Sequence, residues 1–252
     1  MLAELISIRR FGPYAHLVLS APAIARRALP GQFVEVRLSG ENAPFWRRPF
    51  SICRAGNGRV ELLIKSRGRG SALLASLAAK AKVDLLGPLG RGFTLTEKTP
   101  RLLVGGGYGI APLLFLAQRL TAKKIPVEVF IGGHCEEDLL LLREMKLAGA
   151  RVTCTTEDGS AGMRGLVTVP LEARLRQIPG GVRLAACGPQ GLLRAVARLA
   201  QTYQVATEVS LEEVMACGLG VCNGCVVKIK GEYQRVCQDG PVFSAQDVDW
   251  NE

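Results

Sequence analysis

Four cysteines near the end of the chain constrain its fold more than any other feature. Cys217, Cys222, Cys225 and Cys237 have the spacing C-x4-C-x2-C-x11-C, and the first three match a spacing known from [2Fe–2S] clusters. Four thiolates can hold such a cluster, with two on each iron. The loop must then wrap the cluster and point backbone N–H groups at the sulfurs. The glycines between the cysteines permit this, because glycine allows positive φ and close backbone approach.

A structural zinc site and a set of unliganded cysteines are the alternative interpretations. Zinc ribbons usually pair two C-x2-C knuckles, whereas this segment has one knuckle and a glycine-rich arm, so we favour the cluster. Three further cysteines, Cys53, Cys135 and Cys154, are far apart in sequence and are expected to be small core residues. Eight cysteines in a chain that starts without an export signal argue against a disulfide framework, and we expect a cytoplasmic protein.

Composition narrows the class of protein. The 252 residues predict one to two domains, and 48% hydrophobic with 21% charged residues exclude wholesale disorder. The longest uncharged run, 102–118, contains four glycines and a proline, which favours a loop entering a helix over a membrane span. The net charge of +10 comes from Lys and Arg spread along the chain without a dense run. We therefore expect neither a membrane nor a nucleic acid as partner.

The texture of the sequence changes twice, and we expect domains over 1–97, 98–209 and 210–252. The first region has short alternating segments separated by turn residues, which predicts a small β-barrel. It also contains one helical stretch over 71–79, for which Ser71 is the expected N-cap. The six strands are predicted over 5–9, 16–20, 33–38, 50–54, 60–65 and 83–86.

The second region alternates apolar strands with helical stretches, which predicts a parallel sheet with helices on both faces. The third region is short, rich in cysteine and glycine, and carries one strand-like run over 226–229. The predicted fold class is a β-barrel, an α/β parallel-sheet domain and a small C-terminal [2Fe–2S] segment. The strands of the sheet are predicted over 102–104, 127–131, 152–155, 184–186 and 205–209, and its helices over 111–120, 139–147, 167–176 and 190–200.

Two motifs in the barrel region point to a flavin. Arg48-Pro49-Phe50-Ser51 combines a planar guanidinium, which suits a pyrophosphate, with a short hydroxyl. A glycine turn that ends in Gly70 and Ser71 opens a helix, and free N–H groups at such a turn attract phosphate. Together the two motifs resemble the FAD-binding barrel of the ferredoxin-NADP reductase superfamily.

This resemblance implies a role for each residue of the motifs. Arg48 is expected to meet the pyrophosphate, the Ser51 hydroxyl to approach flavin N5, and Gly70 and Ser71 to cap the phosphates. Phe50 stands where many members have tyrosine, so a hydroxyl contact is lost there. The remaining residues of the expected FAD-binding set are Pro49, Leu63, Ile64 and Lys65.

Gly105, Gly107 and Gly109 lie between an apolar strand and the start of a helix. Glycines there let a pyrophosphate approach, and the helix dipole favours its charge, which predicts an NAD site. Cys187 precedes Gly188-Pro189 and resembles the cysteine that lies near nicotinamide C4 in the same superfamily. Cys187 and Ser51 are therefore the expected catalytic residues. Taken alone, Cys187 also fits a buried cysteine at the end of a strand.

Acidic residues after the second and third strands of the sheet favour NAD over NADP. Glu136-Glu137-Asp138 and Glu157 stand where the 2′-phosphate of NADP would need Arg or Lys. The acidic run also fits a solvated helix start that the helix dipole stabilises.

The order of barrel, NAD region and cysteine segment resembles the electron-transfer subunit family of type B, NAD-dependent dihydroorotate dehydrogenase. The resemblance covers nearly the whole chain and is most specific over 213–225 and 236–243. A related transhydrogenase subunit has aspartate at the first ligand position, where this chain has Cys217.

The resemblance implies electron transfer in pyrimidine biosynthesis. Electrons would come from FMN on a separate dihydroorotate dehydrogenase catalytic subunit and pass through the [2Fe–2S] cluster and FAD to NAD⁺, in a heterotetramer. The catalytic (β/α)8 barrel takes about 250 residues, so this chain has no room for it. The alternatives are a reductase subunit for ferredoxin, sulfide dehydrogenase or hydrogenase, and an electron carrier without an enzymatic NAD step.

Overall fold

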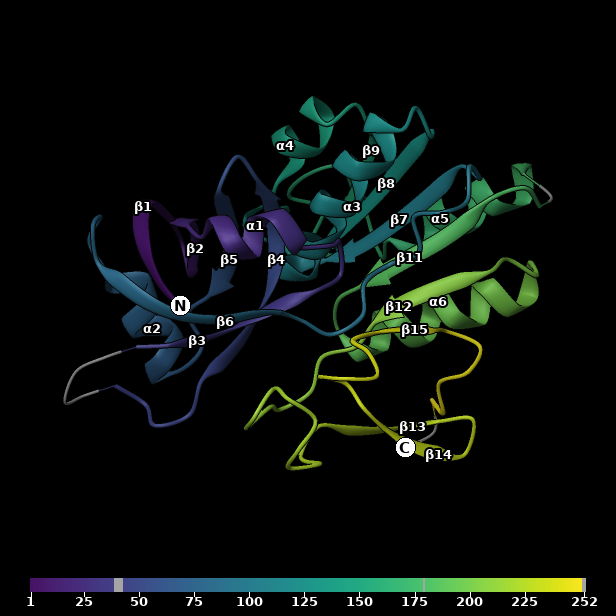
Figure 1. The fold of residues 1–252 in the computed structure, drawn as a ribbon. Coiled ribbons are helices and arrows are strands. Elements are labelled where there is room, and N and C mark those ends of the chain that lie inside the picture. The colour runs from purple at the N-terminus through teal and green to yellow at the C-terminus, as the bar shows by residue number, and fades with distance from the viewer. Residues whose placement is uncertain (39–42, 179, 251–252) are drawn as a thin grey trace.

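The N-terminal region folds into the closed six-stranded barrel that its alternating pattern predicts. The computed structural model describes residues 1–38, 43–178 and 180–250, and the barrel lies to the left in Figure 1. Its strands pair antiparallel in the order β1-β2-β5-β4-β3-β6. Most strands extend beyond the predicted ends: β1 (Leu2–Phe11), β2 (Tyr14–Ser20), β3 (Phe33–Arg37), β4 (Arg48–Gly56), β5 (Arg59–Lys65) and β6 (Lys82–Leu89).

The helices of this region differ from the prediction. Helix α1 (Pro22–Arg27) was not predicted; proline in its first turn suits a helix start, but six residues show little periodicity. Helix α2 (Arg69–Ser76) begins two residues before Ser71, and its N-cap is Gly68. The prediction of Ser71 as N-cap was therefore wrong. The Ser71 hydroxyl instead accepts hydrogen bonds from the backbone N–H groups of Arg67 and Gly68, at 2.9 and 3.1 Å.

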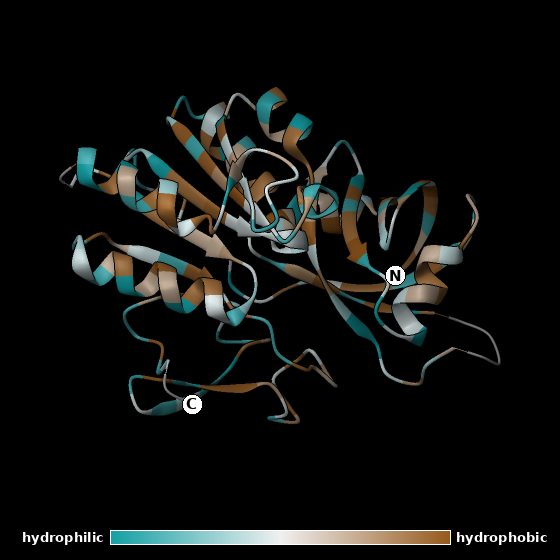
Figure 2. Cartoon of the chain, turned by 180° about the vertical axis from the view of Figure 1, so that it is seen from behind, coloured by the Kyte–Doolittle hydropathy of each residue, from teal (hydrophilic) through white to brown (hydrophobic). Residues whose placement is uncertain are grey.

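The second region forms the predicted parallel sheet with helices on both faces. Helices α3 and α4 pack on one face with one apolar cluster, and α5 and α6 pack on the other face with a second cluster. In Figure 2, the sheet strands are mostly hydrophobic, whereas α6 alternates hydrophilic and hydrophobic residues. The elements are β7 (Arg101–Gly106), β8 (Val127–Gly133), β9 (Arg151–Thr156), β10 (Met163–Arg164), β11 (Arg183–Cys187), β12 (Thr207–Ser210), α3 (Ile110–Ala122), α4 (Leu142–Leu147), α5 (Thr168–Gln177) and α6 (Gln190–Thr202).

Helix α4 is shorter than predicted. Leu141 has a left-handed backbone with φ of +58°, so the α-helix cannot start before Leu142. The acidic run Glu136–Asp138 forms a separate 3-10 turn, η2. The dipole of a long helix therefore does not account for that acidic run.

The C-terminal segment joins the sheet as well as forming its own hairpin. Strands β13 (Val226–Ile229) and β14 (Glu232–Arg235) pair antiparallel, as expected for a strand over 226–229. Strand β15 (Val242–Ser244) then pairs antiparallel with β12, and Val209 lies opposite Phe243. The sheet order is β10-β9-β8-β7-β11-β12-β15. The segment is thereby attached to the edge of the parallel sheet, as the yellow strand of Figure 1 shows.

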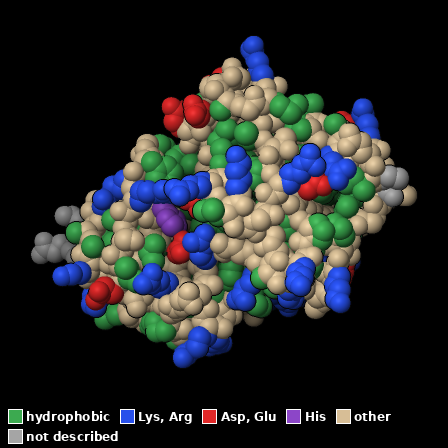
Figure 3. Space-filling view, turned by 90° about the horizontal axis from the view of Figure 1, so that it is seen from above, with side chains coloured by type: hydrophobic (Ala, Val, Ile, Leu, Met, Phe, Trp, Pro, Cys, Tyr) green, Lys and Arg blue, Asp and Glu red, His purple; other side chains and the backbone are tan. Residues whose placement is uncertain are grey.

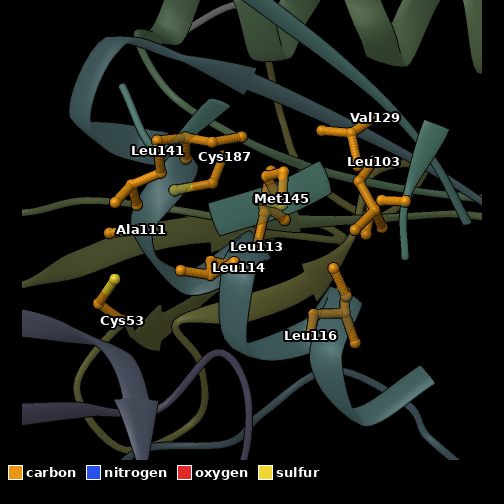
Figure 4. Close-up of a cluster of buried hydrophobic side chains, with 14 of the residues drawn as sticks. Cys53, Leu103, Ala111, Leu113, Leu114, Leu116, Val129, Leu141, Met145 and Cys187 are labelled. Carbon is orange, nitrogen blue, oxygen red and sulfur yellow. The ribbon is translucent and has the colours of Figure 1, made fainter. Parts of the chain in front are cut away.

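The barrel and the sheet share buried side chains. One apolar cluster joins barrel residues such as Cys53 and Leu63 to Leu113 and Leu114 of α3 and to Cys187 of β11; Figure 4 shows part of it. Phe115 of α3 points the other way, into the barrel core, and is 1% exposed. Helix α3 therefore packs between the two regions and fixes one against the other.

In the described residues, no helix is long and apolar enough to cross a bilayer. Figure 3 shows Lys and Arg side chains scattered over one face among neutral and acidic groups, without a continuous basic stripe on that face.

Replacement of Phe115 tests the role of α3 as the link between barrel and sheet. We expect Phe115→Ala to destabilise the cofactor-loaded protein by about 3–5 kcal/mol, the usual cost of a large cavity in a core. The matched control is Leu147→Ala, because Leu147 is 76% exposed. Denaturant unfolding followed by circular dichroism measures both variants. Equal midpoints for the two variants would contradict the role of Phe115.

Candidate functional site

The structure brings the four cysteines of the C-terminal segment together. The loop between β12 and β13 carries Cys217, Cys222 and Cys225, and Cys237 follows β14. Backbone N–H groups point at each sulfur, as the glycine-rich sequence led us to expect. The N–H to Sγ distances are 3.4 Å from Leu219 to Cys217, 3.4 Å from Gly224 to Cys222, 3.4 Å from Cys237 to Cys225 and 3.1 Å from Gly220 to Cys237.

The thiols are arranged as two pairs, Cys217 with Cys222 and Cys225 with Cys237. Within the described ranges, no three His, Cys, Asp or Glu side chains are placed to hold a metal ion. Pairs of thiols fit a cluster that takes two ligands on each iron better than a mononuclear zinc site. Burial works against ionisation of Cys217, but the N–H groups of Leu219, Cys222 and Val221 bring its pKa down to about 6.

Two glycines of this loop are required by the space around them. Gly218 has φ of +65°, and a Cβ there would lie 2.6 Å from the side chain of Glu35. Gly220 has φ of +76°, and a Cβ would collide with the Gln238 amide. Glu35 is fully buried and its burial raises the pKa of its carboxyl to about 7. The cysteine loop therefore lies directly against β3 of the barrel.

The residues of the expected flavin site line a cavity of about 470 Å³. Three parts of the chain form most of its lining: the barrel strands β4 and β5 with the start of α2, the turn before α3, and the segment 210–215 that leads to the cysteines. The expected residues on its wall are Arg48, Pro49, Phe50, Ser51, Leu63, Ile64, Lys65, Gly70 and Ser71.

The local packing of this cavity fits a bound phosphate chain. A Cβ on Gly70 would lie 3.2 Å from Nε of Arg48, so a larger residue would press on that guanidinium. Arg48 is steadied by donating to the backbone carbonyls of Trp46 and Arg47, at 2.8 and 3.0 Å. The Arg48 guanidinium is therefore held next to the glycine turn, where an anion can meet both.

A second cavity of about 360 Å³ lies at the carboxyl ends of the sheet strands. Gly107 lines it with φ of +51°, and nothing lies within 4 Å of where its Cβ would be. This open approach to the backbone suits a pyrophosphate. Gly105 and Gly109 serve packing instead: a Cβ on Gly105 would meet Ile110, and one on Gly109 would meet the backbone of Cys187.

Cys187 ends β11 and is fully buried, with its thiol in the shared apolar cluster. Burial and the nearby Glu212 carboxylate raise its pKa above the usual range. The thiol is therefore held protonated. Among the other cysteines outside the C-terminal segment, Cys53 is buried as expected, but Cys135 and Cys154 are only half-buried. The prediction of a core position for those two was wrong, because Cys135 follows the end of β8 and Cys154 lies on β9, beside the edge strand of the sheet.

The acidic residues near the second cavity have different tasks. Asp138 accepts a hydrogen bond from the Tyr14 hydroxyl at 2.5 Å and lies 3.9 Å from Nζ of Lys65. Burial works to raise the pKa of Asp138, but the hydrogen bonds from Tyr14 and the His134 N–H keep it below its ordinary value. Glu157 also lines the cavity and is half-exposed beside His134. Glu136 and Glu137 are not among the residues of the cavity wall, so Glu157 and Asp138 carry the acidity at this site.

Three functional candidates were missed by sequence reasoning: Arg67, Tyr108 and Glu212. Arg67 and Tyr108 line both cavities, and Glu212 lines the first. The Tyr108 hydroxyl donates to Glu212 at 3.0 Å across 104 positions of sequence. The glycine motif around Tyr108 was visible in the sequence, but nothing local indicated its partner.

Family models match three consecutive parts of the chain. Residues 13–93 match the oxidoreductase FAD-binding domain, and residues 103–198 match the oxidoreductase NAD-binding domain. Residues 212–249 match the iron-sulfur cluster binding domain of dihydroorotate dehydrogenase B. The three cofactors expected from the motifs, FAD, NAD and an iron–sulfur cluster, therefore each have a matching domain.

Curated relatives are similar over most of their length. The "Dihydroorotate dehydrogenase B (NAD(+)), electron transfer subunit" of Bacillus caldolyticus is 39% identical over 92% of this chain and 91% of the relative. The protein of the same name from Desulforamulus reducens is 37% identical over 98% of this chain and 97% of the relative.

Solved structures share the fold. The structure of an NADH-dependent reduced ferredoxin-NADP oxidoreductase superposes on this chain with a TM-score of 0.89 and 28% identity. The match covers 100% of this chain and 91% of the other. The ferredoxin reductase in carbazole 1,9a-dioxygenase superposes with a TM-score of 0.69 and 23% identity, over 81% of this chain and 66% of the other.

Replacement of one ligand tests the assignment of the cysteine segment. We expect Cys222→Ser to lose iron and acid-labile sulfide while retaining FAD, because the flavin cavity is built mainly from the barrel. Cys154→Ser is the control, since Cys154 lies outside the segment. Metal analysis and visible absorbance of the purified proteins give the readout. Zinc without sulfide in the unmodified protein would refute the cluster.

Nucleotide choice tests the role of Glu157. We expect NADH to reduce the flavin at least about tenfold more efficiently than NADPH, since like charges at close range cost ~1.4 kcal/mol or more. Glu157→Arg should narrow this preference. Glu136→Arg should not, because that side chain is outside the cavity wall. Stopped-flow bleaching with both nucleotides measures the rates. Faster bleaching by NADPH in the unmodified protein would overturn the assignment.

Proposed function

The chain belongs to the family of electron transfer subunits of dihydroorotate dehydrogenase B (NAD(+)), and on that basis we propose the route of electrons through it. It is an NAD-dependent oxidoreductase component with FAD, NAD and iron–sulfur domains. Electrons from an FMN-containing catalytic subunit, which oxidises dihydroorotate in pyrimidine biosynthesis, enter at the cysteine segment and leave on NAD⁺.

One observation carries this proposal. The wall of the flavin cavity contains Ser51 of the barrel, Tyr108 of the turn before α3 and Met215 of the segment that leads to the cysteines. Each of the three cofactor domains thus contributes to one cavity. When bound, a [2Fe–2S] cluster exchanges single electrons, FAD exchanges one or two, and NAD⁺ accepts a hydride. A chain that lines one cavity from all three domains can connect these exchanges.

The residues of the chain have distinct tasks in this scheme. Arg48 and the glycine turn at Gly70 hold the negative phosphate chain of the flavin cofactor. The half-buried Ser51 hydroxyl is available to hydrogen-bond the reacting edge of the ring. Gly107 admits the nucleotide pyrophosphate against the backbone, while Lys65 and Arg67, on the walls of both cavities, offset its charge.

The cysteine loop supplies the proposed contact with the catalytic subunit. Leu219 and Val221 lie on this loop and are 51% and 78% exposed. Apolar side chains at such exposure, beside a redox group, fit an interface that excludes water. We propose that the two subunit types assemble as a heterotetramer. Its place of action would be the cytoplasm, where thiols stay reduced and can serve as cluster ligands.

A charge at the proposed interface tests the partner assignment. We expect Leu219→Asp to raise the dissociation constant for the catalytic subunit at least about tenfold, because an unpaired carboxylate in a buried contact costs ~2 kcal/mol or more. Transfer from dihydroorotate to NAD⁺ should fall with assembly. NADH-driven reduction of an artificial acceptor should persist, because the flavin and nucleotide cavities are formed elsewhere.

The matched control is Val169→Asp on α5, because Val169 is also exposed, at 60%, but lies outside the cysteine segment. Sedimentation of the mixed subunits and iron content are measured for both variants. Full iron content with unchanged subunit binding in Leu219→Asp would refute this contact surface.

A further inference from the structure

Tyr108 stands at the border between the two cavities. Among the residues that the structure describes, three line both the flavin cavity and the nucleotide cavity: Lys65, Arg67 and Tyr108. Hydride transfer requires the donor and acceptor atoms to come within about 3–3.5 Å of each other. The nicotinamide of a nucleotide bound at Gly107 must therefore cross the border that Tyr108 occupies in order to reach the flavin.

The Tyr108 side chain is held on two sides. Its hydroxyl donates a hydrogen bond to Glu212 at 3.0 Å, which ties the nucleotide turn to the start of the C-terminal segment. The guanidinium carbon of Arg67 lies 5.1 Å from the centre of the Tyr108 ring, a distance typical of a cation–π contact. Burial, followed by the Glu212 carboxylate, raises the pKa of Tyr108 to about 12. The hydroxyl therefore remains a donor to Glu212.

Cys187 lies close to the contacts that hold the Tyr108 side chain. Its side chain is fully buried, and Tyr108 packs against the apolar cluster that contains it. Glu212 is close enough to Cys187 to raise the pKa of the thiol. A cysteine expected to meet the nicotinamide is thus closed off from both cavities. The turn that carries Tyr108 packs closely against the backbone of Cys187, since a Cβ on Gly109 would be 2.6 Å from the Cys187 carbonyl oxygen.

We propose that Tyr108 is a gate, latched by Glu212 and Arg67, which covers Cys187 and moves aside when the nicotinamide of NAD enters the flavin cavity. The inference rests on the proposed function, because it assumes hydride exchange between NAD and the flavin. Gly107, directly before Tyr108, has φ of +51° and nothing within 4 Å of where its Cβ would be, so it allows the backbone change that such a movement needs. Tyr108 is a positioning residue, since it controls access to the reacting atoms.

A closed gate lowers the apparent affinity for the nucleotide. When only a fraction of the protein is open, the apparent dissociation constant rises by the inverse of that fraction. Removal of the ring must therefore strengthen NADH binding. A tyrosine that simply supported the nucleotide would have the opposite effect when removed. The sign of the change distinguishes the two roles.

Thiol alkylation tests the gate on the protein itself. The cofactor-loaded protein is exposed briefly to N-ethylmaleimide, and modification of each cysteine is measured by mass spectrometry. We expect the rate at Cys187 in Tyr108→Ala to rise about tenfold relative to Cys53, which is equally buried in the same cluster (Figure 4). Because Cys53 reports general loosening, the ratio of the two rates isolates the local opening. An unchanged ratio overturns the proposal.

NADH titration provides the second measurement. We expect Tyr108→Ala to lower the NADH concentration that half-saturates flavin reduction, and Tyr108→Phe to lower it about two- to tenfold, as for loss of one hydrogen bond. Tyr203→Phe is the control, because its hydroxyl bonds Glu172 on the far side of the sheet. A higher half-saturating concentration in Tyr108→Ala overturns the gate. Absence of flavin reduction by NADH in the unmodified protein would instead refute the proposed function.

Discussion

The pairing of β15 with β12 is the interaction on which the arrangement of the site depends. Val209 and Phe243 lie opposite each other in this pair, and the Leu211 N–H donates to the Pro241 carbonyl at 2.9 Å. This contact folds the C-terminal segment back over the barrel, where Phe33 of β3 packs with Cys225 and Phe243. Without it, the cysteine loop would hang from the sheet by a single strand, and the flavin cavity would lose one wall.

Close packing of backbone is the second requirement of the site. Three redox groups can exchange electrons in one chain only if little protein separates them. The structure meets this with glycines where domains touch: Gly218 lies against the buried Glu35 of the barrel, and Gly109 lies against the backbone of Cys187. A side chain at either glycine would collide with its neighbour at 2.6 Å. The same packing closes the route to Cys187, which is why access requires a movable residue.

The parts that sequence could predict are those whose cause is local. Cysteine spacing, the Arg48–Ser51 motif and the glycine turn before α3 are each short runs whose chemistry depends on adjacent residues. Strand β15 and the Tyr108–Glu212 hydrogen bond join positions far apart in the chain, so no periodicity indicates them. Serine is a residue type common at N-caps, which is why Ser71 was predicted, but the turn before it makes Gly68 the N-cap of α2. Cys187 was found by resemblance, whereas its complete burial follows from tertiary packing alone.

In the proposed route, the chain connects NAD, FAD and the cluster in series, with the flavin in the middle. Stopped-flow absorbance and rapid-freeze electron paramagnetic resonance after anaerobic mixing with NADH test this order. The purified chain, without a partner, should lose flavin absorbance first and then gain the signal of a reduced [2Fe–2S] cluster. The same protein stripped of FAD should give no cluster signal. A cluster signal in flavin-free protein, or a fully reduced flavin beside a permanently oxidised cluster, would contradict the series.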